Sequence, residues 1–438
     1  MDFRYPPDAE VFRAAVRAWL AANLPAELRG VTVRDDLTPE LVERLRAWNR
    51  TLADAGYAGM SWPKEYGGRA ASVIEQVVLT EEMSRAEAPG PINVIGLSNI
   101  APAIMTYGTA AQRSRFLRPM LRGDEIWCQG FSEPNAGSDL ASITTRAVRD
   151  GDHFVVNGQK VWNTLGEYAD WCELLVRTNA GAAKHEGISC LLVDLRTPGI
   201  VIRPIVTITG GREFAELFFE DVRVPASALL GPLDGGWKVA MATLSHERAG
   251  VASLHLQVRK RVARLIEDAR ATVVDGAPVT ADPMKRRELA RAYMLAEHMK
   301  FLADRALSAS VLGRPPGPEG SLAKLVWSDT ENAIAATAGR VLGPAANSGR
   351  WGEQRVYVRA TSIAGGTTQV NRNIIAARVL GLPRSRTPRS SPPRRTPRLL
   401  VGAGFIPARG GFAATDSCGR GQAPPLRAED GRASRAGR

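Results

Sequence analysis

The chain has 438 residues, 44% of them hydrophobic and 23% charged, the balance of a globular protein large enough for several domains. No apolar run approaches the roughly 20 residues that a membrane-spanning helix needs, which argues against a membrane protein. The net charge of +12 is concentrated in residues 384–438, which hold twelve arginines and three acidic residues, so the remainder is too close to neutral for a nucleic-acid-binding body.

The N-terminus and the potential metal ligands also limit the class of protein. Charged residues and prolines occupy the start of the chain, where a secretory signal would have an apolar core. The four cysteines and five histidines are scattered without the spacing of a zinc site. We therefore expect a cytoplasmic protein without a metal.

Residues 1–120 are predicted to form an N-terminal helical domain. Asp8 is a plausible N-cap, and Phe12, Val16 and Leu20 then follow at helical spacing. Turn chemistry appears at residues 62–68 (WPKEYGG), and a further helical stretch covers residues 74–83.

Residues 121–235 have the pattern of a compact, central antiparallel β domain. Asp-Gly and Asn-Gly turn dipeptides begin at positions 150 and 157, beside short runs rich in β-branched and aromatic residues. The predicted strands cover residues 153–156, 171–176, 188–193, 201–205 and 217–224.

Residues 236–383 return to a helical pattern. One stripe recurs at steps of three and four residues, and it is apolar except for the carboxylate of Glu247. The stripe consists of Ala240, Leu244, Glu247, Val251, Leu254, Val258, Val262 and Leu265. A single carboxylate in such a stripe is a candidate for function, although a buried glutamate paired with His246 or Arg248 is a structural alternative.

Residues 384–438 differ in composition from the rest of the chain. They consist mainly of Arg, Pro, Gly, Ser and Ala, and such a segment buries too little apolar surface to offset the entropy of ordering. We expect a disordered tail, and truncation after Pro383 is expected to leave folding and activity intact. A nucleic-acid-binding arm is the alternative, but the tail lacks aromatic residues interleaved with its arginines.

Two motifs in the middle of the chain are typical of a cofactor site. Residues 129–140 read QGFSEPNAGSDL, and residues 157–164 read NGQKVWNT. Glycines let backbone N–H groups approach a cofactor, small hydroxyl residues donate hydrogen bonds, and Trp162 offers a flat ring for stacking. Taken alone, a tryptophan such as Trp162 is more often a core residue than a ligand contact.

In form and order these two motifs resemble the flavin-binding signature of the acyl-CoA dehydrogenase family. The resemblance covers roughly residues 1–383 and includes residues 366–372 (GTTQVNR). It implies a three-part α+β fold of N-terminal helical domain, central β domain and C-terminal four-helix bundle. It also implies FAD as cofactor, an acyl-CoA as substrate and an electron-transfer flavoprotein as electron acceptor.

The resemblance further implies the residues of the site. The flavin would be held by Gln129, Phe131, Ser132, Ser138, Trp162, Asn163, Thr164, Thr367 and Gln369. The substrate would be contacted by Ser138, Arg248 and Gly366.

The catalytic base is expected at Glu247. Most of the family carries the base directly before the Gly-Thr of the late motif, where this chain has Gly365. A minority of the family carries it on the helix after the β domain, directly before an arginine, and Glu247–Arg248 matches that position. Glu247 would remove the α-proton, and a hydride would pass from the β carbon to the flavin.

Two departures from the family concern the assembly. The Arg-x-x-Phe-Gly element, which contacts the flavin of a neighbouring subunit, is absent from residues 272–289, and the family's Gln-x-x-Gly-Gly segment reads RVLGP at residues 340–344. A homo-oligomer (dimer or tetramer) and a heteromer with a paralogous chain therefore both stay open. A non-catalytic partner subunit and the chemistry of the related flavin oxidases are further alternatives.

Overall fold

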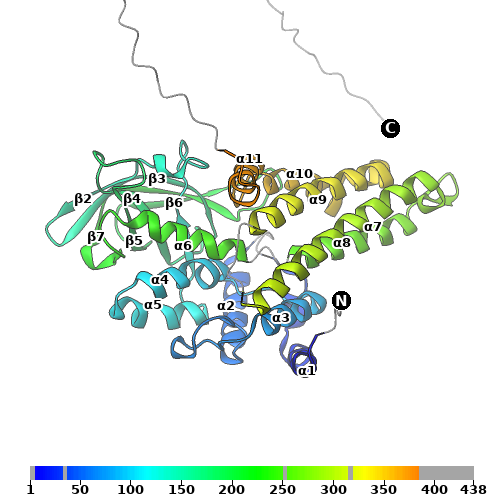
Figure 1. The fold of residues 1–438 in the computed structure, drawn as a ribbon, viewed down its shortest axis with the longest axis horizontal. Coiled ribbons are helices and arrows are strands. Elements are labelled where there is room, and N and C mark those ends of the chain that lie inside the picture. The colour runs from blue at the N-terminus through cyan, green and yellow to red at the C-terminus, as the bar shows by residue number, and fades with distance from the viewer. Residues whose placement is uncertain (1–4, 33–36, 250–253, 314–318, 384–438) are drawn as a thin grey trace, which may run out of the picture. The chain divides into compact units, whose positions relative to one another are not determined.

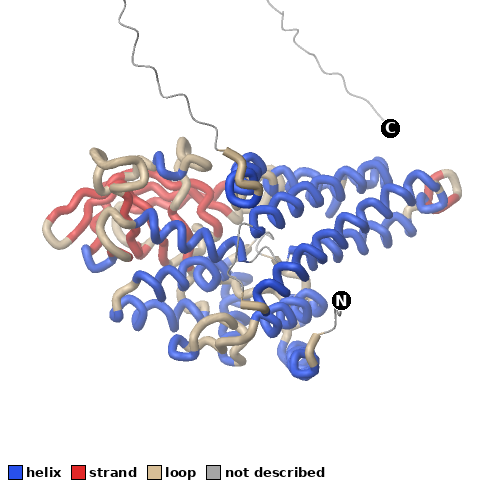
Figure 2. Tube along the Cα trace, viewed as in Figure 1, coloured by secondary structure: helices blue, strands red, loops and turns tan. Residues whose placement is uncertain are grey.

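The computed structural model describes residues 5–32, 37–249, 254–313 and 319–383, without the side chains of residues 246–249 and 319. Within these ranges, helices are followed by a β-sheet and then by a second set of helices, as Figure 1 and Figure 2 show. This confirms the predicted fold class. The predicted tail (residues 384–438), Val251 of the apolar stripe and the side chains of Glu247 and Arg248 lie outside the described residues.

The N-terminal helices begin at clear capping signals. The hydroxyl of Thr38 accepts a hydrogen bond from the backbone N–H of Leu41, and Ser72 and Glu75 form a reciprocal capping box. The helices are α1 (Pro7–Asn23), α2 (Pro39–Asp54), α3 (Val73–Ala86), α4 (Ala101–Tyr107) and α5 (Ala110–Arg122).

The predicted N-cap at Asp8 is wrong. Helix α1 begins at Pro7, so Asp8 lies within its first turn and Pro6 occupies the cap position. Proline is favoured at the first helical position because its fixed φ suits the helix and its missing N–H is one that the helix would leave unpaired, and the helix begins without a capping side chain. The predicted apolar face is confirmed, because Phe12, Val16 and Leu20 are buried.

The sheet contains every strand predicted from the sequence. Its order is β6-β7-β3-β2-β4-β5-β8, with β1 paired to β4. Most neighbours are antiparallel, but β1 and β2 pair with β4 in parallel, which the strand pattern did not predict. The strands are β1 (Trp127–Gly130), β2 (Arg146–Asp150), β3 (His153–Thr164), β4 (Trp171–Arg177), β5 (Ile188–Asp194), β6 (Ile200–Ile205), β7 (Phe214–Pro225) and β8 (Leu229–Leu230).

The two faces of the sheet belong to different hydrophobic clusters. Leu174 and Leu191 pack with other strand residues on one face. Trp127, Leu175 and Leu192 belong to the cluster that contains the N-terminal helices. Alternate residues of a strand therefore serve two cores, which explains why β4 and β5 are almost continuously apolar.

The C-terminal helices form a third core. Helices α7, α8 and α9 pack on one another, and Val258, Val262 and Leu265 of the predicted stripe are buried there. A short hairpin of β9 (Val273–Val274) and β10 (Ala277–Pro278) connects α7 to α8. The helices are α6 (Gly236–Ala249), α7 (Leu254–Ala271), α8 (Pro283–Val311), α9 (Glu319–Leu342), α10 (Gly349–Thr361) and α11 (Thr368–Ile374).

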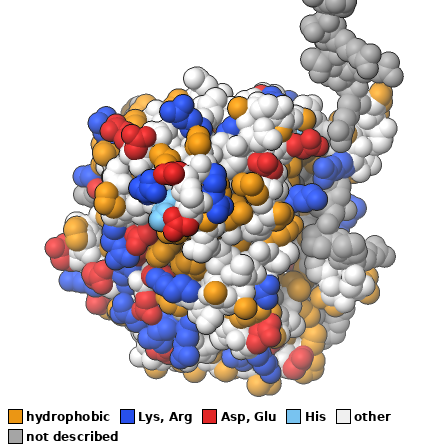
Figure 3. Space-filling model, turned by 90° about the vertical axis from the view of Figure 1, so that its left-hand side faces the viewer, with side chains coloured by type: hydrophobic (Ala, Val, Ile, Leu, Met, Phe, Trp, Pro, Cys, Tyr) orange, Lys and Arg blue, Asp and Glu red, His pale blue; other side chains and the backbone are white. Residues whose placement is uncertain are grey.

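Helix α6 connects the sheet to both sets of helices, since it packs against β5, α4 and α9 (Figure 1). A Cβ on Gly236, its first residue, would lie 2.4 Å from the backbone carbonyl carbon of Ser189, so only glycine allows this close approach to β5. Acidic and basic side chains are interspersed over the surface in Figure 3. No helix in the described part of the chain is long and apolar enough to cross a membrane.

Candidate functional site

The first motif begins on β1 and continues in the loop that follows it. Gly130 ends the strand, and a Cβ there would lie 2.7 Å from the Cys172 sulfur, so glycine is required for β1 to pair closely with β4. The loop then turns back, and Glu133 and Ala136 exchange backbone hydrogen bonds of 3.1 and 3.0 Å. The motif thus forms a compact loop at the end of β1.

A buried ion pair joins this loop to the second motif on β3. The ammonium group of Lys160, which is 0% exposed, donates to Glu133 Oε1 at 2.8 Å and to the Phe131 carbonyl at 3.1 Å. The Glu133 carboxylate also accepts hydrogen bonds from the backbone N–H groups of Thr144 and Thr145. Glu133 and Lys160 were not predicted as site residues, although both lie within the two motifs.

The pKa values of Glu133 and Lys160 indicate that both side chains are charged although they are buried away from water. Burial by itself would raise the pKa of Glu133, but the charge of Lys160 and the donated hydrogen bonds lower it to about 2. Burial lowers the pKa of Lys160 to about 8, against the opposing effect of Glu133. The pair therefore connects the two motifs electrostatically near neutral pH.

The second motif contains a β-bulge that turns Trp162 outward. The pairing of β3 with β7 shifts between Lys160 and Asn163, and Trp162 adopts φ +64° at this point. Its side chain is 58% exposed and lies edge-on to Phe214, with ring centroids 5.8 Å apart. The core alternative for Trp162 is therefore wrong, and its ring is available to a ligand.

The structure brings the predicted residues of the two motifs together. The Asn163 amide donates to the Gln129 carbonyl at 2.6 Å, and the backbone N–H of Val161 donates to the Ser132 carbonyl at 2.9 Å. Phe131 is buried beside them, and Thr164 is half-buried at the end of β3. Gln129, Phe131, Ser132, Trp162, Asn163 and Thr164 thus form one group, whereas Ser138 is exposed farther along the loop.

The late motif lies at the start of α11. Thr367 is the N-cap of this helix, and its hydroxyl accepts from the backbone N–H of Val370 at 3.1 Å. Gly365 and Gly366 are left-handed, with φ +62° and +88°, and Gln369 is exposed. No hydrogen bond among the described residues connects Gly366, Thr367 or Gln369 to the first two motifs, so their place in the site stays a prediction.

Two buried amide atoms indicate that the group of motif residues can hold a polar planar ligand. Gln129 Nε2, a donor, and Asn163 Oδ1, an acceptor, have no hydrogen-bond partner among the described residues. Unpartnered buried polar atoms are costly, so a ligand or water normally satisfies them. The edge of an isoalloxazine ring carries both donors and acceptors, and Trp162 offers it an aromatic face. These residues therefore fit a flavin.

The predicted base lies on the last turn of α6. Glu247 and Arg248 are helical, while their side chains are outside the described residues. Upstream in the same helix, Val239, Ala240 and Thr243 are fully buried.

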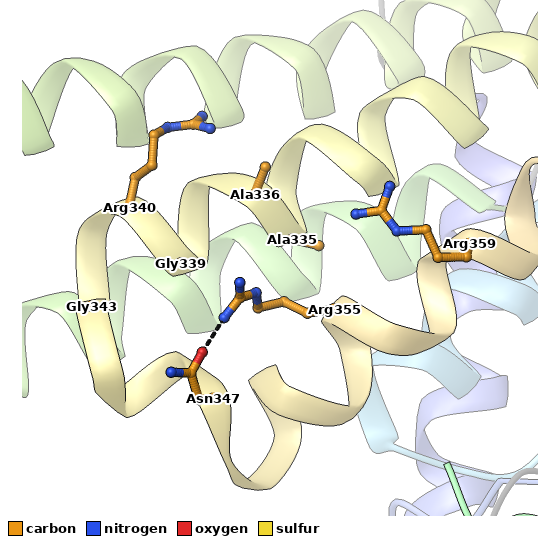
Figure 4. Close-up of a pocket in the computed structure, with 8 residues that line it drawn as sticks. All are labelled: Ala335, Ala336, Gly339, Arg340, Gly343, Asn347, Arg355 and Arg359. Atoms are coloured by element: carbon orange, nitrogen blue, oxygen red, sulfur yellow. Dashed lines mark hydrogen bonds between the residues drawn. The ribbon is translucent and has the colours of Figure 1, made fainter. Parts of the chain in front are cut away.

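A pocket with basic lining lies between α9 and α10 (Figure 4). It has a volume of about 420 Å³ and includes Arg340 and Gly343 of the segment that resembles the family's Gln-x-x-Gly-Gly. Arg340 pairs with Glu288 at 2.6 Å, and Arg355 donates to Asn347. Among the described residues no acidic side chain pairs with Arg355 or Arg359. The pocket is therefore electropositive.

Comparisons with known proteins cover most of the chain. Models of the N-terminal, middle and C-terminal domains of acyl-CoA dehydrogenases match residues 6–124, 128–222 and 234–380. Acyl-CoA dehydrogenase IpdE1 of Mycobacterium tuberculosis is 42% identical over 388 residues, which cover 86% of this chain and 98% of that protein.

Two solved structures share the fold. The Tcur3481-Tcur3483 steroid ACAD matches with a TM-score of 0.77 and 33% identity over 88% of this chain and 100% of that chain. The ChsE4-ChsE5 complex from Mycobacterium tuberculosis matches with a TM-score of 0.77 and 32% identity, again over 88% and 100%. With its paired motifs and its three matched domains, the chain belongs to the acyl-CoA dehydrogenase family of FAD-dependent oxidoreductases.

Proposed function

We propose that this chain catalyses α,β-dehydrogenation of an acyl-CoA thioester, with Glu247 as the base. The observation that carries the proposal is the pair of motifs joined by Lys160 and Glu133, which contain two unpartnered buried amide atoms, Gln129 Nε2 and Asn163 Oδ1, and an exposed ring at Trp162. The chain has glycine at 365, where most of the family has its base, and a carboxylate at 247. Glu247 is thus the candidate that this chain retains.

In the proposed mechanism, the residues of the chain orient the substrate and manage the proton. Ser138 and Arg248 contact the acyl-CoA, and Glu247 removes the α-proton. The electron pair of the broken C–H bond forms the new double bond, and the β-hydrogen leaves as a hydride. FAD, when bound, would supply the acceptor of this hydride, and we propose an electron-transfer flavoprotein as the acceptor of the two electrons. The flavin ring that accepts the hydride would be held by Trp162, Gln129 and Asn163.

We propose a bulky acyl group as the substrate class to test first. One of the solved structures that share the fold is described as a steroid ACAD. By similarity to that protein, a steroid-derived CoA ester is a candidate substrate of this chain. The panel of substrates should therefore include short linear, branched and steroid-ring acyl-CoA esters.

The competing function is that of a half-site subunit in a heteromer. It is favoured by the missing Arg-x-x-Phe-Gly element in residues 272–289 and by the changed segment at residues 340–344. The solved ChsE4-ChsE5 complex, a relative made of two different chains, also favours it. In this case the electropositive pocket between α9 and α10 would face a partner chain.

Anaerobic titration of the purified chain with the acyl-CoA panel tests both functions through flavin absorbance. Bleaching by one ester supports the dehydrogenase, and Glu247→Gln should keep the flavin while losing reduction by several orders of magnitude, on the order of 10³-fold or more. A Glu247→Gln variant with near-normal turnover would remove Glu247 from the mechanism. A colourless chain that becomes yellow only when co-expressed with a paralogue would favour the heteromer.

A further inference from the structure

A second carboxyl group lies buried where α6 crosses the sheet. Glu173 belongs to β4 and is 0% exposed. In the sheet, Glu173 lies directly opposite Gln129 on β1 and Leu192 on β5. These three side chains therefore lie on the same face of the sheet. This is the face that packs against helices, and Glu173 interrupts an otherwise apolar strand there.

Glu173 has no positive partner among the side chains that the structure describes. In the described chain no lysine, arginine or histidine forms an ion pair with it, and its Oε2 has no hydrogen-bond partner. Without a compensating charge, burial raises the pKa of Glu173 to about 8. This upward shift of the pKa favours the neutral, protonated form of the Glu173 carboxyl group near neutral pH.

The partner of this acid is a helix residue. Glu173 Oε1 lies 2.8 Å from the hydroxyl oxygen of Thr243 on α6, which is itself fully buried, and 3.9 Å from the Cys190 sulfur. The Thr243 hydroxyl also lies 3.2 Å from the carbonyl oxygen of Val239. The Thr243 hydroxyl donates to Glu173 Oε1, and the Val239 carbonyl, one turn earlier in α6, is a second acceptor within its reach. One threonine thus connects β4 to the backbone of α6.

The contact between Glu173 and Thr243 lies close to the proposed base in the same helix. Gly236 fixes the beginning of α6 against β5 through its lack of a side chain, and Thr243 fixes its middle against β4. Glu247 is the residue one helical turn after Thr243. A shift or rotation of α6 at Thr243 would therefore be transmitted directly to the position of Glu247.

We propose that Glu173 and Thr243 are positioning residues, which set the placement of α6 on the sheet and thereby aim Glu247 at the substrate. This inference rests on the proposed role of Glu247 as the base. An apolar pair at 173 and 243 could also fill the space, but it would fix neither the rotation nor the axial position of the helix as a directional hydrogen bond does.

Four variants test the inference in the flavin-loaded protein. Glu173→Leu and Thr243→Val remove the polar contact while keeping similar volume, and Glu173→Gln and Thr243→Ser keep it. The readout is the rate of flavin reduction at saturating acyl-CoA in anaerobic stopped flow, measured well below the unfolding temperature. Flavin content and the substrate dissociation constant are measured in parallel.

We expect Glu173→Leu and Thr243→Val to slow reduction by about tenfold to hundredfold, because small misplacements of a catalytic group have effects of this size. The substrate dissociation constant should change much less. Glu173→Gln and Thr243→Ser should restore most of the rate. Thr330→Val is the matched control, since Thr330 is a buried threonine of α9 whose hydroxyl has no partner among the described residues.

The outcomes separate this inference from the proposed function. Wild-type reduction rates in folded, flavin-loaded Thr243→Val and Glu173→Leu would overturn the positioning role. If only Glu173→Leu fails to fold, the isosteric Thr243→Val still decides the matter. Glu247→Gln is measured beside them: if it too reduces flavin normally, Glu247 is not the base and the premise of this inference fails, whereas a wild type whose flavin no acyl-CoA reduces would overturn the dehydrogenase function itself. An inactive Glu247→Gln beside fully active Thr243→Val refutes only the positioning role.

Discussion

Replacing Lys160 by methionine should destabilise the protein and weaken its flavin site together. Lys160 is fully buried and gives its two described hydrogen bonds to Glu133 Oε1 and to the Phe131 carbonyl. Methionine fills much of the same volume but leaves the Glu133 carboxylate without a positive charge. Only the hydrogen bonds from Thr144 and Thr145 would then compensate that buried charge.

The expected loss is about 3–5 kcal/mol of unfolding free energy, because removal of one partner leaves an uncompensated charge in a dry site. The matched control is Lys184→Met. Lys184 pairs with Asp139 near the same loop, but the two side chains are 48% and 62% exposed. Water screens that pair, so the control should change stability by no more than about 0.5 kcal/mol.

Urea unfolding of Lys160→Met, Glu133→Gln and the double variant provides the assay, followed by circular dichroism and by flavin release. The double variant should be more stable than the sum of the single losses predicts, by at least about 1 kcal/mol, since it removes both charges. The reasoning is refuted if Lys160→Met is as stable as Lys184→Met, or if the two single losses simply add.

Two further predictions concern pH and cofactor affinity. Burial raises the folded-state pKa of Glu173 from 4.5 to about 8. The stabilisation provided by its neutral form is therefore fully present below about pH 4.5, declines as the pH rises from there and is lost above about pH 8, a change on the order of 5 kcal/mol at most. Thermal unfolding between pH 5 and pH 9 should show a steeper decline for the wild type than for Glu173→Gln, and equal slopes would contradict the neutral acid. Trp162→Ala should weaken FAD binding about three- to tenfold in a fluorescence titration of the apoprotein, because it removes an exposed stacking surface, whereas Trp162→Phe should bind nearly as the wild type does. Unchanged affinity in Trp162→Ala would exclude stacking on this ring.

The periodicity of the sequence was sufficient to predict the helical, β and helical parts of the chain. Alternating and continuous apolar runs located the strands from His153 to Pro225, and a three-to-four residue repeat located the buried face of α7. These signals are local, because a strand or helix imposes its own period on the side chains that face a core. The two motifs that resemble a flavin-binding signature were also local signals, since each is a continuous segment.

The tertiary structure decided what these segments contact. Glu133 and Lys160 are 27 residues apart, and only the folding of the loop back onto β3 makes them an ion pair. The outward direction of Trp162 depends on a β-bulge, which a one-residue change in the register of β3 against β7 creates.

The surroundings of Glu173 are a further feature that the sequence alone does not determine. Its sequence context, a charged residue in an apolar strand, does not say whether it faces solvent, a cation or a helix. The parallel pairing of β1 with β4 and the crossing of α6 bring it to Thr243, 70 residues away, in a site where the described side chains supply no counter-charge. Its protonation is therefore a property of packing, because the free energy of a charge depends on the groups that surround it and not on its neighbours in the chain.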